Sequence, residues 1–194
     1  MVDTDGVRPG PRRTLSEEAI LDAALSLLAE SGADRVTIRG IAARVGVAPN
    51  GVYTYFPDKA AVLHGVVESI LGGVNHDRFV DPSLPWRDRI EALALELRGE
   101  LLAHPGSVHL LLADPMTGAN SRAVTDTVLS ILADAGLPPE DAMLASHLIS
   151  VHVLGSVALE VADPRMSDAE DRAARYLWGL TRVLDGLSTH GGAR

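Results

Sequence analysis

The sequence contains no cysteine, and this absence excludes a disulfide framework, a thiolate metal site and a cysteine nucleophile. A chain without disulfides suits a reducing compartment, so we expect it to be cytoplasmic. Aromatic residues are also scarce: they form 4% of the chain, although 46% of its residues are hydrophobic. The apolar positions are mostly Ala, Leu and Val spread over long segments, which predicts an all-α fold rather than a sandwich or a barrel.

Long uncharged stretches are few. The first thirty residues hold charges from Asp3 through Arg13 to Glu18, so they lack the apolar region that a secretory signal requires. Residues 142–159 form a run of 18 without Asp, Glu, Lys or Arg, which meets the lower length limit for a membrane span. Two histidines and three serines in this run would be costly against lipid, and no basic flank or aromatic belt frames it. We therefore expect a buried helix and no membrane partner.

Basic residues are outnumbered, and the formal net charge is −9. The acid is unevenly placed, however. From residue 8 to residue 59 there are seven basic and six acidic residues, so this segment is near neutral. The excess of acidic residues lies in the rest of the chain, mainly in the body that follows this segment. Because an acidic body repels DNA phosphates, binding to DNA would need a local, correctly aimed set of cations and would fall steeply with salt.

The N-terminal segment predicts an arm followed by short helices. Residues 1–14 are rich in Gly, Pro and Arg and are expected to form a loose basic arm. Ser16, followed by two glutamates, predicts the N-cap of a helix that ends at Gly32. Thr37 predicts the N-cap of a second, short helix that ends at Gly46.

A third and a fourth helix follow at once. Residues 46–48 form a three-residue break before Pro49, which suits the first turn of a third short helix. Pro57 ends that helix, and Asp58 caps a fourth that extends to about residue 72. Two short helices joined by a three-residue turn that contains Gly, with a longer helix before and after, describe a helix-turn-helix. The first short helix braces the second, whose exposed side chains enter the major groove.

The rest of the chain predicts longer helices separated by Gly and Pro breakers, with no convincing strand. We place these helices at roughly residues 84–103, 105–113, 118–135, 139–162 and 167–188. The predicted organisation is a flexible basic arm (1–14), a helix-turn-helix DNA-binding head (15–72) and a helical body (73–194).

Residues 37–59, with the sequence TIRGIAARVGVAPNGVYTYFPDK, resemble the head of tetracycline-repressor-like (TetR family) regulators. The match covers about residues 15–70 and includes the cap threonine, the turn, the tyrosine, the Phe-Pro pair and the trailing lysine. The body resembles the family in layout and in two short runs, 86–89 and 102–105. The resemblance implies an N-terminal three-helix head on a larger helical body that binds a ligand and dimerises.

The resemblance also implies a set of DNA contacts around the third helix. In this set Thr37 contacts a phosphate, Arg39 reads guanine and Asn50 reads adenine through two hydrogen bonds. Two tyrosines and a threonine reach phosphates or thymine methyl groups, the only lysine meets a phosphate, and the arm arginines enter the minor groove as homeodomain arms do. The full set is Arg12, Arg13, Thr37, Arg39, Ala48, Pro49, Asn50, Gly51, Tyr53, Thr54, Tyr55 and Lys59.

Alternatives stay open for several of these positions. Tyr53 also fits the core, where Phe56 is expected in any case. Arg39 and Arg44 also fit solvated surface charges, and the arm also fits an idle terminus. One position departs from the family pattern, because Ala48 stands where a hydroxyl often caps the recognition helix and touches phosphate. Replacing such a cap by Ala costs about 0.5 to 2 kcal/mol.

Because one head reads only one half-site, we expect a homodimer on a palindromic operator of double-stranded DNA. In the last predicted helix, five apolar residues recur at the spacing of a heptad seam: Ala173, Leu177, Leu180, Leu184 and Leu187. The helix at 139–162 is apolar nearly all round. The resemblance implies that these two helices form a four-helix dimer interface; the alternative is a seam that only closes the monomer.

The body is also expected to hold a small-molecule effector, because long helices with many small residues leave room for an apolar cavity. The candidate lining residues are Asn75, Leu93, Leu97, His109, Val128, His147 and Val151. Each histidine also fits an ordinary core or surface position. His109 resembles in position a histidine that family members use on a metal-chelated drug, but we assign no metal and no cofactor.

Enzyme signatures are missing from the sequence. The only lysine follows aspartate, so there is no Gly-Lys phosphate loop, and neither G-x-G-x-x-G nor G-x-S-x-G occurs. Two histidine pairs are five residues apart, which suits no shared metal on a helix. We expect no enzyme but a ligand-responsive DNA-binding regulator, most simply a repressor that a small apolar effector releases from its operator. The alternatives are a helical dimeric protein-interaction module and an unrecognised enzyme.

Overall fold

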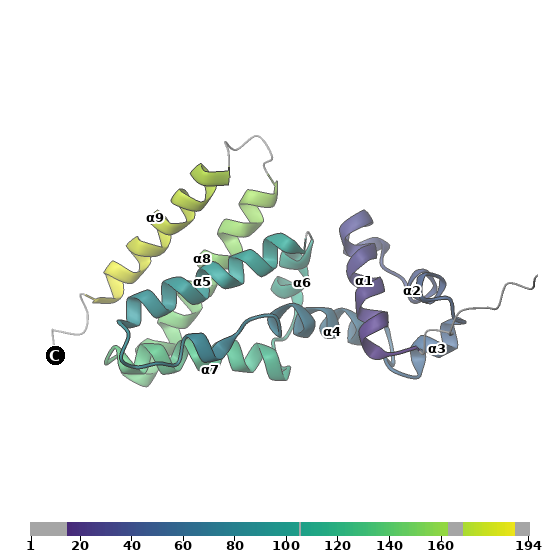
Figure 1. The fold of residues 1–194 in the computed structure, drawn as a ribbon, viewed down its shortest axis with the longest axis horizontal. Helices are drawn as coiled ribbons and strands as arrows, with labels where there is room; N and C mark the ends of the chain where they lie inside the picture. The colour runs from purple at the N-terminus through teal and green to yellow at the C-terminus, as the bar shows by residue number, and fades with distance from the viewer. Residues whose placement is uncertain (1–14, 105, 163–168, 189–194) are drawn as a thin grey trace, which may run out of the picture.

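The computed structural model describes residues 15–104, 106–162 and 169–188. These ranges hold nine α-helices, two short 3-10 helices and no strand, so the predicted all-α class is confirmed (Figure 1). The head helices gather at one end of the molecule and the body helices at the other (Figure 1). The predicted arm, with its candidate contacts Arg12 and Arg13, lies outside the described residues.

The head and its link to the body consist of α1 (Glu17–Ser31), α2 (Ile38–Val45), α3 (Pro49–Tyr53) and α4 (Lys59–Leu71), with η1 (Ala33–Arg35) after α1. Three of these helices begin at the caps that the sequence predicts. Ser16, Thr37 and Asp58 each accept a hydrogen bond from the N–H group three residues ahead, at 3.2, 3.0 and 2.8 Å respectively. These bonds satisfy amide groups that the first turn of a helix leaves without a partner.

The turn between α2 and α3 depends on Gly46. This residue ends α2 in the left-handed conformation (φ 76°, ψ 32°), which residues with a Cβ rarely adopt. The chain then enters α3 through Ala48, which offers no side-chain cap, and Pro49, whose fixed φ suits a first helical turn.

α3 is only 5 residues long, so packing rather than its own hydrogen bonds must hold it in place. Val52 is fully buried, and Phe56, which follows the helix, is 6% exposed, as the sequence predicts for a core residue. Both belong to the apolar core that α1, α2 and α4 supply. The head contributes Ile20, Ala24, Leu28, Ile41, Ala42, Val62 and Val66 to this core. The recognition segment is thereby held to its neighbours at two points.

The body contains η2 (His76–Arg78), α5 (Trp86–Ala103), α6 (Ser107–Ala113), α7 (Ala119–Asp134), α8 (Pro139–Ala162) and α9 (Ala169–Ser188). All five α-helices match predicted ones, with ends within two residues of the prediction where the structure describes them. The sequence does not predict the two 3-10 turns, because three residues carry no periodic signal. α8 packs against α5, α6, α7 and α9 and so forms the centre of the body.

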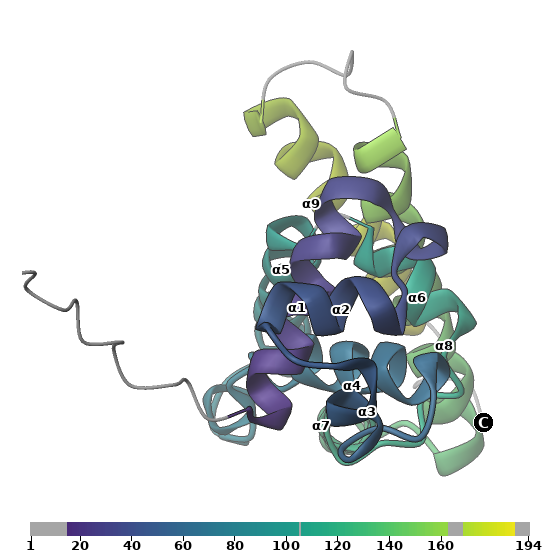
Figure 2. The ribbon, with the colours of Figure 1, turned by 90° about the vertical axis from the view of Figure 1, so that its right-hand side faces the viewer.

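α4 joins the two parts of the molecule. It packs against α1 on the side of the head and against α5, α6 and α7 on the side of the body. Figure 2 faces the head end, where α1, α2 and α3 lie nearest the viewer and the body lies behind them. A change in the direction of α4 would therefore move the whole head relative to the body.

α8 has the length and composition of a membrane-spanning helix. In the fold, six of its side chains are buried against other helices: Ala142, Ala145, Ser146, Ile149, Val153 and Val157. Its other face is exposed and carries the large apolar side chains Met143, Leu144, Leu148, Val151, Leu159 and Val161. The predicted buried helix is thus buried on one face only.

Two arginines in the run 86–89 tie the body together. Arg89 is buried, and its Nε donates to the Phe79 carbonyl at 2.7 Å while Nη1 donates to Asp134 at the end of α7 at 2.8 Å. Arg87 donates to Asp185 on α9. This run, which contributes to the family resemblance, therefore has a structural role.

Phe56→Ala should lower the free energy of unfolding by about 3 to 5 kcal/mol, because it removes a buried ring and leaves a cavity. Tyr53→Ala is the matched control: Tyr53 is 51% exposed, so its loss should change the free energy of unfolding by less than about 1 kcal/mol. Chemical denaturation followed by circular dichroism measures both variants. Equal losses would show that Phe56 does not anchor α3.

Candidate nucleic-acid interface

α3 turns one side to its own core and the other to solvent. Val52 is fully buried, whereas Pro49 and Asn50 at the start of the helix are exposed. α3 lies at the end of the molecule remote from α8 and α9 (Figure 1). A short helix that is braced from behind by α2 and exposed at its leading edge has the form that the major groove accepts.

The ten candidate DNA contacts within the described residues all reach the surface. Eight of them are exposed: Thr37, Arg39, Ala48, Pro49, Asn50, Tyr53, Thr54 and Tyr55. Gly51 and Lys59 are half-buried. They come from the N-terminal ends of α2, α3 and α4 and from the residues that end α3, so the fold gathers them around one helix-turn-helix.

The two arginines of α2 differ in their surroundings. Arg44 makes a two-bond ion pair with Glu30 of α1, from Nη1 to Oε1 at 2.8 Å and from Nη2 to Oε2 at 2.6 Å. The hydrogen bonds from Arg44 hold the pKa of the Glu30 carboxyl below its ordinary value. Arg39 is exposed and makes no hydrogen bond or ion pair within the described ranges. Arg39 is therefore the arginine of α2 that is available to a base edge, and Arg44 fits the alternative of a surface charge.

The residues that end α3 stand on the outside of the head. The exposure of Tyr53 contradicts the alternative that places it in the core. Tyr55 Oη donates to the Leu15 carbonyl at 2.6 Å and so ties the end of α3 to the residue before the α1 cap. Thr54 Oγ1 donates to the Asn50 carbonyl at 3.2 Å. The exposed side-chain amide of Asn50 has no partner among the residues that the structure describes.

Lys59 begins α4 and is half-buried. Its Nζ donates to the Ala33 carbonyl in η1 at 2.9 Å. An ammonium group has three hydrogens, so this bond positions the charge and leaves two donors for another acceptor. The phosphate contact of Lys59 stays a prediction.

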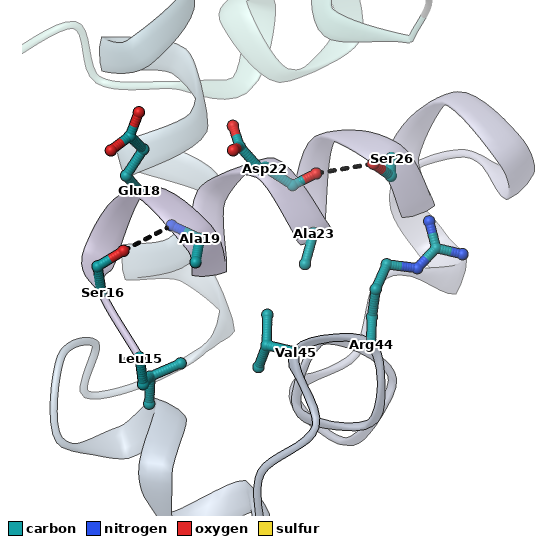
Figure 3. Close-up of a pocket in the computed structure, with 9 residues that line it drawn as sticks. All are labelled: Leu15, Ser16, Glu18, Ala19, Asp22, Ala23, Ser26, Arg44 and Val45. Atoms are coloured by element: carbon teal, nitrogen blue, oxygen red, sulfur yellow. Dashed lines mark hydrogen bonds between the residues drawn. The ribbon is translucent and has the colours of Figure 1, made fainter. Parts of the chain in front are cut away.

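A groove of about 520 Å³ lies between α1 and α2 (Figure 3). Its charged lining residues are Glu18 and Asp22 from α1 and Arg44 from α2. The two carboxylates outnumber the single cation, which is already bonded to Glu30. Because this lining would repel phosphates, we do not expect the groove to face DNA.

The seven candidate effector residues differ in exposure, and none of them lines the groove between α1 and α2. Four of them are exposed on the body: Asn75, His109, His147 and Val151. Leu93 and Val128 are buried in the core, and Leu97 is half-buried. Since residues four apart on a helix share a face, His147 and Val151 both lie on the outward face of α8. The role of these seven residues toward an effector stays a prediction.

Two grooves along α4 could not be predicted from the sequence. One of about 610 Å³ lies between α1, α4 and the start of α7, and one of about 420 Å³ lies between α4 and α6. His64 borders both grooves, and its Nδ1 lies 2.8 Å from Oδ2 of Asp114, the residue that follows α6. No sequence signal marks this pair, because 50 positions separate the two residues.

The predicted dimer seam on α9 needs a correction. Leu180 and Leu184 are 1% and 2% exposed within a single chain, so they are not available to a partner. Ala173, Leu177 and Leu187 are half-buried. For Leu180 and Leu184 the interface prediction is wrong, because a heptad seam marks an apolar helix face without saying which surface covers it.

Large exposed apolar side chains of the body lie on α8 and on α9. Leu144, Leu148 and Val151 follow one another on the outward face of α8 at spacings of four and three. On α9, Trp178 is 68% exposed and immediately follows Leu177. The signal for the α8 surface was present in the sequence, since a helix that is apolar all round carries more apolar residues than one core face needs.

Comparison with known families assigns both parts of the chain. Residues 20–66, from α1 into α4, match the family model described as bacterial regulatory proteins, tetR family. Residues 81–174, from the segment before α5 into α9, match the model described as tetracyclin repressor-like, C-terminal domain.

Individual relatives cover most of the chain. A transcriptional regulator of the HTH type from Saccharopolyspora erythraea is 32% identical over 160 residues, which are 82% of this chain and 67% of that protein. The class C tetracycline repressor protein from Escherichia coli is 32% identical over 168 residues, which are 84% of this chain and 73% of the repressor. Among solved structures, a TetR variant from Acinetobacter baumannii in complex with minocycline is similar with a TM-score of 0.77, 25% identity, and coverage of 93% of this chain and 100% of that one.

Asn50→Ala should reduce discrimination between base pairs by about 1 to 3 kcal/mol at one position of each half-site, because the variant loses a side chain that bonds a base edge. Gel-shift titrations on duplexes with single base-pair changes measure the preference. Arg44→Ala is the control, and both its affinity and its base preference should stay nearly unchanged since Arg44 is engaged by Glu30. An unaltered preference in Asn50→Ala would mean that the recognition edge lies elsewhere.

Proposed function

The chain belongs to the TetR family of bacterial regulatory proteins, and from this premise we propose that it is a ligand-responsive transcriptional regulator. It acts in the cytoplasm as a homodimer, most simply as a repressor that a small apolar effector releases from a palindromic operator. The single observation that carries this proposal is the exposed leading edge of α3, fixed from behind by the buried Val52 and Phe56.

In the proposed complex, some side chains would position the protein on the phosphates and others would read the bases. Thr37 caps α2 and Lys59 begins α4, so the two residues flank α3 in the sequence, and both suit contacts to the phosphates. The side chains of Asn50 and Arg39 have geometries that match the edges of adenine and guanine, respectively, in the major groove. Because α3 itself offers no charge, the affinity depends on few cations, which matches a chain of net charge −9.

The outward face of α8 supports the homodimer. Its exposed leucines and valines give α8 an apolar face of the kind that marks protein interfaces, and Trp178 on α9 is exposed as well. Aromatic residues such as tryptophan are enriched where such interfaces are strongest. A partner seated on this face would also cover His147 and Val151, so an effector site that includes them would be completed by both chains.

Release would follow from a change in the separation of the heads. In the proposed mechanism, the effector-free dimer holds its heads at the operator spacing, and an effector bound in the body turns α4 so that both heads no longer dock together. The packing of α4 against helices of both parts supports this route. The minocycline complex of the Acinetobacter baumannii relative supports a small-molecule effector as the class of ligand.

Binding to a duplex taken from upstream of the chain's own gene tests the function. The logarithm of affinity should fall linearly with the logarithm of salt concentration, because each phosphate contact releases counterions. Lys59→Ala should weaken binding to all sequences alike and flatten this slope by about 1. An unrelated duplex of equal length is the control. The absence of any binding at low salt would favour a helical interaction module or an enzyme instead.

Leu144→Glu should convert the dimer to a monomer. Burying an uncompensated carboxylate costs about 3 kcal/mol or more, and a two-fold symmetric interface buries one from each chain. The dissociation constant should therefore rise on the order of 10⁴-fold. Sedimentation velocity over a range of concentrations measures the change. Leu84→Glu, at an exposed leucine before α5, is the matched control and should remain dimeric. A dimeric Leu144→Glu would move the interface away from α8.

A further inference from the structure

The end of α4 is joined to the start of α7 by reciprocal hydrogen bonds. The Glu68 carboxylate accepts from the N–H groups of Asn120 (2.7 Å) and Ser121 (3.0 Å) and from the Ser121 hydroxyl. In return, the side-chain amide of Asn120 donates to the Glu68 carbonyl at 2.8 Å. We call these bonds among Glu68, Asn120 and Ser121 the α4–α7 clasp.

The clasp supplies a cap that α7 lacks in its own sequence. The residue before α7 is Gly118, which has no side chain to cap the helix. The Glu68 carboxylate takes this role at the positive end of a 16-residue helix, where a negative charge is favourable. Partial burial raises the pKa of Glu68, but the bonds from the Ser121 hydroxyl and the two N–H groups outweigh burial and lower that pKa overall. Glu68 is therefore an anion at neutral pH.

Two glycines make room for the clasp. A Cβ at Gly118 would lie 1.9 Å from Cδ of Glu68, and a Cβ at Gly72 would lie 2.7 Å from Nδ2 of Asn120. Both glycines have ordinary φ values, −73° and −68°, so space rather than backbone conformation requires them. The clasp is thus closely fitted from the side of α4 and from the side of α7.

Two grooves flank α4. The groove of about 420 Å³ lies between the N-terminal half of α4 and α6, and the groove of about 610 Å³ extends along α4 from Ala61 and His64 to Glu68, Gly118 and Asn120 at the clasp. The contact between Nδ1 of His64 and Oδ2 of Asp114, at 2.8 Å, lies at the border of the second groove. α4 is therefore joined to α7 near its C-terminal end and is flanked by open space between the clasp and the head.

We propose that Glu68 is a positioning residue whose clasp is the pivot of α4, and that through α4 it sets the orientation of the head relative to the body. That this orientation matters for operator binding rests on the proposed function. The orientation itself is a property of the chain and exists without DNA. A plain helix cap would stabilise α7 without fixing the head. The two explanations differ in what the head does once the clasp is removed.

The absence of cysteine makes this orientation measurable. Ala29 on α1 and Ser130 on α7 are both exposed, and Ala29→Cys with Ser130→Cys provides one site for a dye on the head and one on the body. Labelled protein is diluted into an excess of unlabelled protein, so that an assembly carries one labelled chain. Single-molecule energy transfer then gives the distribution of head-to-body distances without DNA or effector.

Glu68→Ala and Gly118→Ala should each broaden this distribution and shift its mean, because they open the clasp from opposite sides. Ser121→Ala removes only the hydroxyl bond to Glu68, so it should broaden and shift the distribution in the same way but less. This variant keeps the test available if Glu68→Ala does not fold. Glu96→Ala is the matched control, since Glu96 is also a half-buried carboxylate that accepts a backbone N–H, from Asn75 at 2.7 Å, but within the body. It should lower the melting temperature and leave the distances unchanged.

A folded clasp variant with a lowered melting temperature and an unchanged distance distribution would overturn the proposal and leave a plain helix cap. Equal broadening in Glu96→Ala would overturn it as well. Operator binding by the parent chain is measured separately in the salt titration, so failure of the proposed function is recognised independently of the distances.

Discussion

α4 packs against the head on one side and against the body on the other, and this shared position constrains the rest of the structure. Beside Gly65, where a Cβ would lie 3.1 Å from the Phe56 ring, the helix closes the core of the head. One turn later, Glu68 joins it to α7 of the body. Because protein cores are close-packed and do not deform continuously, a helix shared by two of them transmits a displacement instead of absorbing it. The head and the body are therefore separate in layout but mechanically continuous.

Electrostatics restrict where such an acidic chain meets DNA. The carboxylates of α1 line a groove on one side of the head, and Arg44 is held there by Glu30. Arg39 is exposed, and Lys59 is half-buried with its Nζ bonded to the Ala33 carbonyl. With few cations and a repulsive body, only a docked arrangement that brings these groups to the duplex is favourable, which links specificity to geometry more than to net attraction.

α8 shows how one helix serves two surfaces. Six small or branched side chains enter the core, while larger ones such as Leu144 and Leu148 remain exposed in the single chain. The seam on α9 lies on the inner side of the same pair of helices, with Trp178 on the outer side. Both patterns have helical spacing, so periodicity identifies an apolar face but does not distinguish the core from a partner.

The sequence by itself determined the helices, their caps and the helix-turn-helix, because these depend on contacts between residues three or four apart: Ser16, Thr37 and Asp58 each bond the third N–H ahead. The family resemblance in the sequence also indicated that Asn50 lies at the start of α3, where the structure shows it exposed. Only the tertiary structure decided which face of α9 is buried, that Arg44 is engaged by Glu30, and that Glu68 caps a helix more than fifty positions away. Such pairs depend on how helices are placed in space, and local periodicity carries no record of that placement.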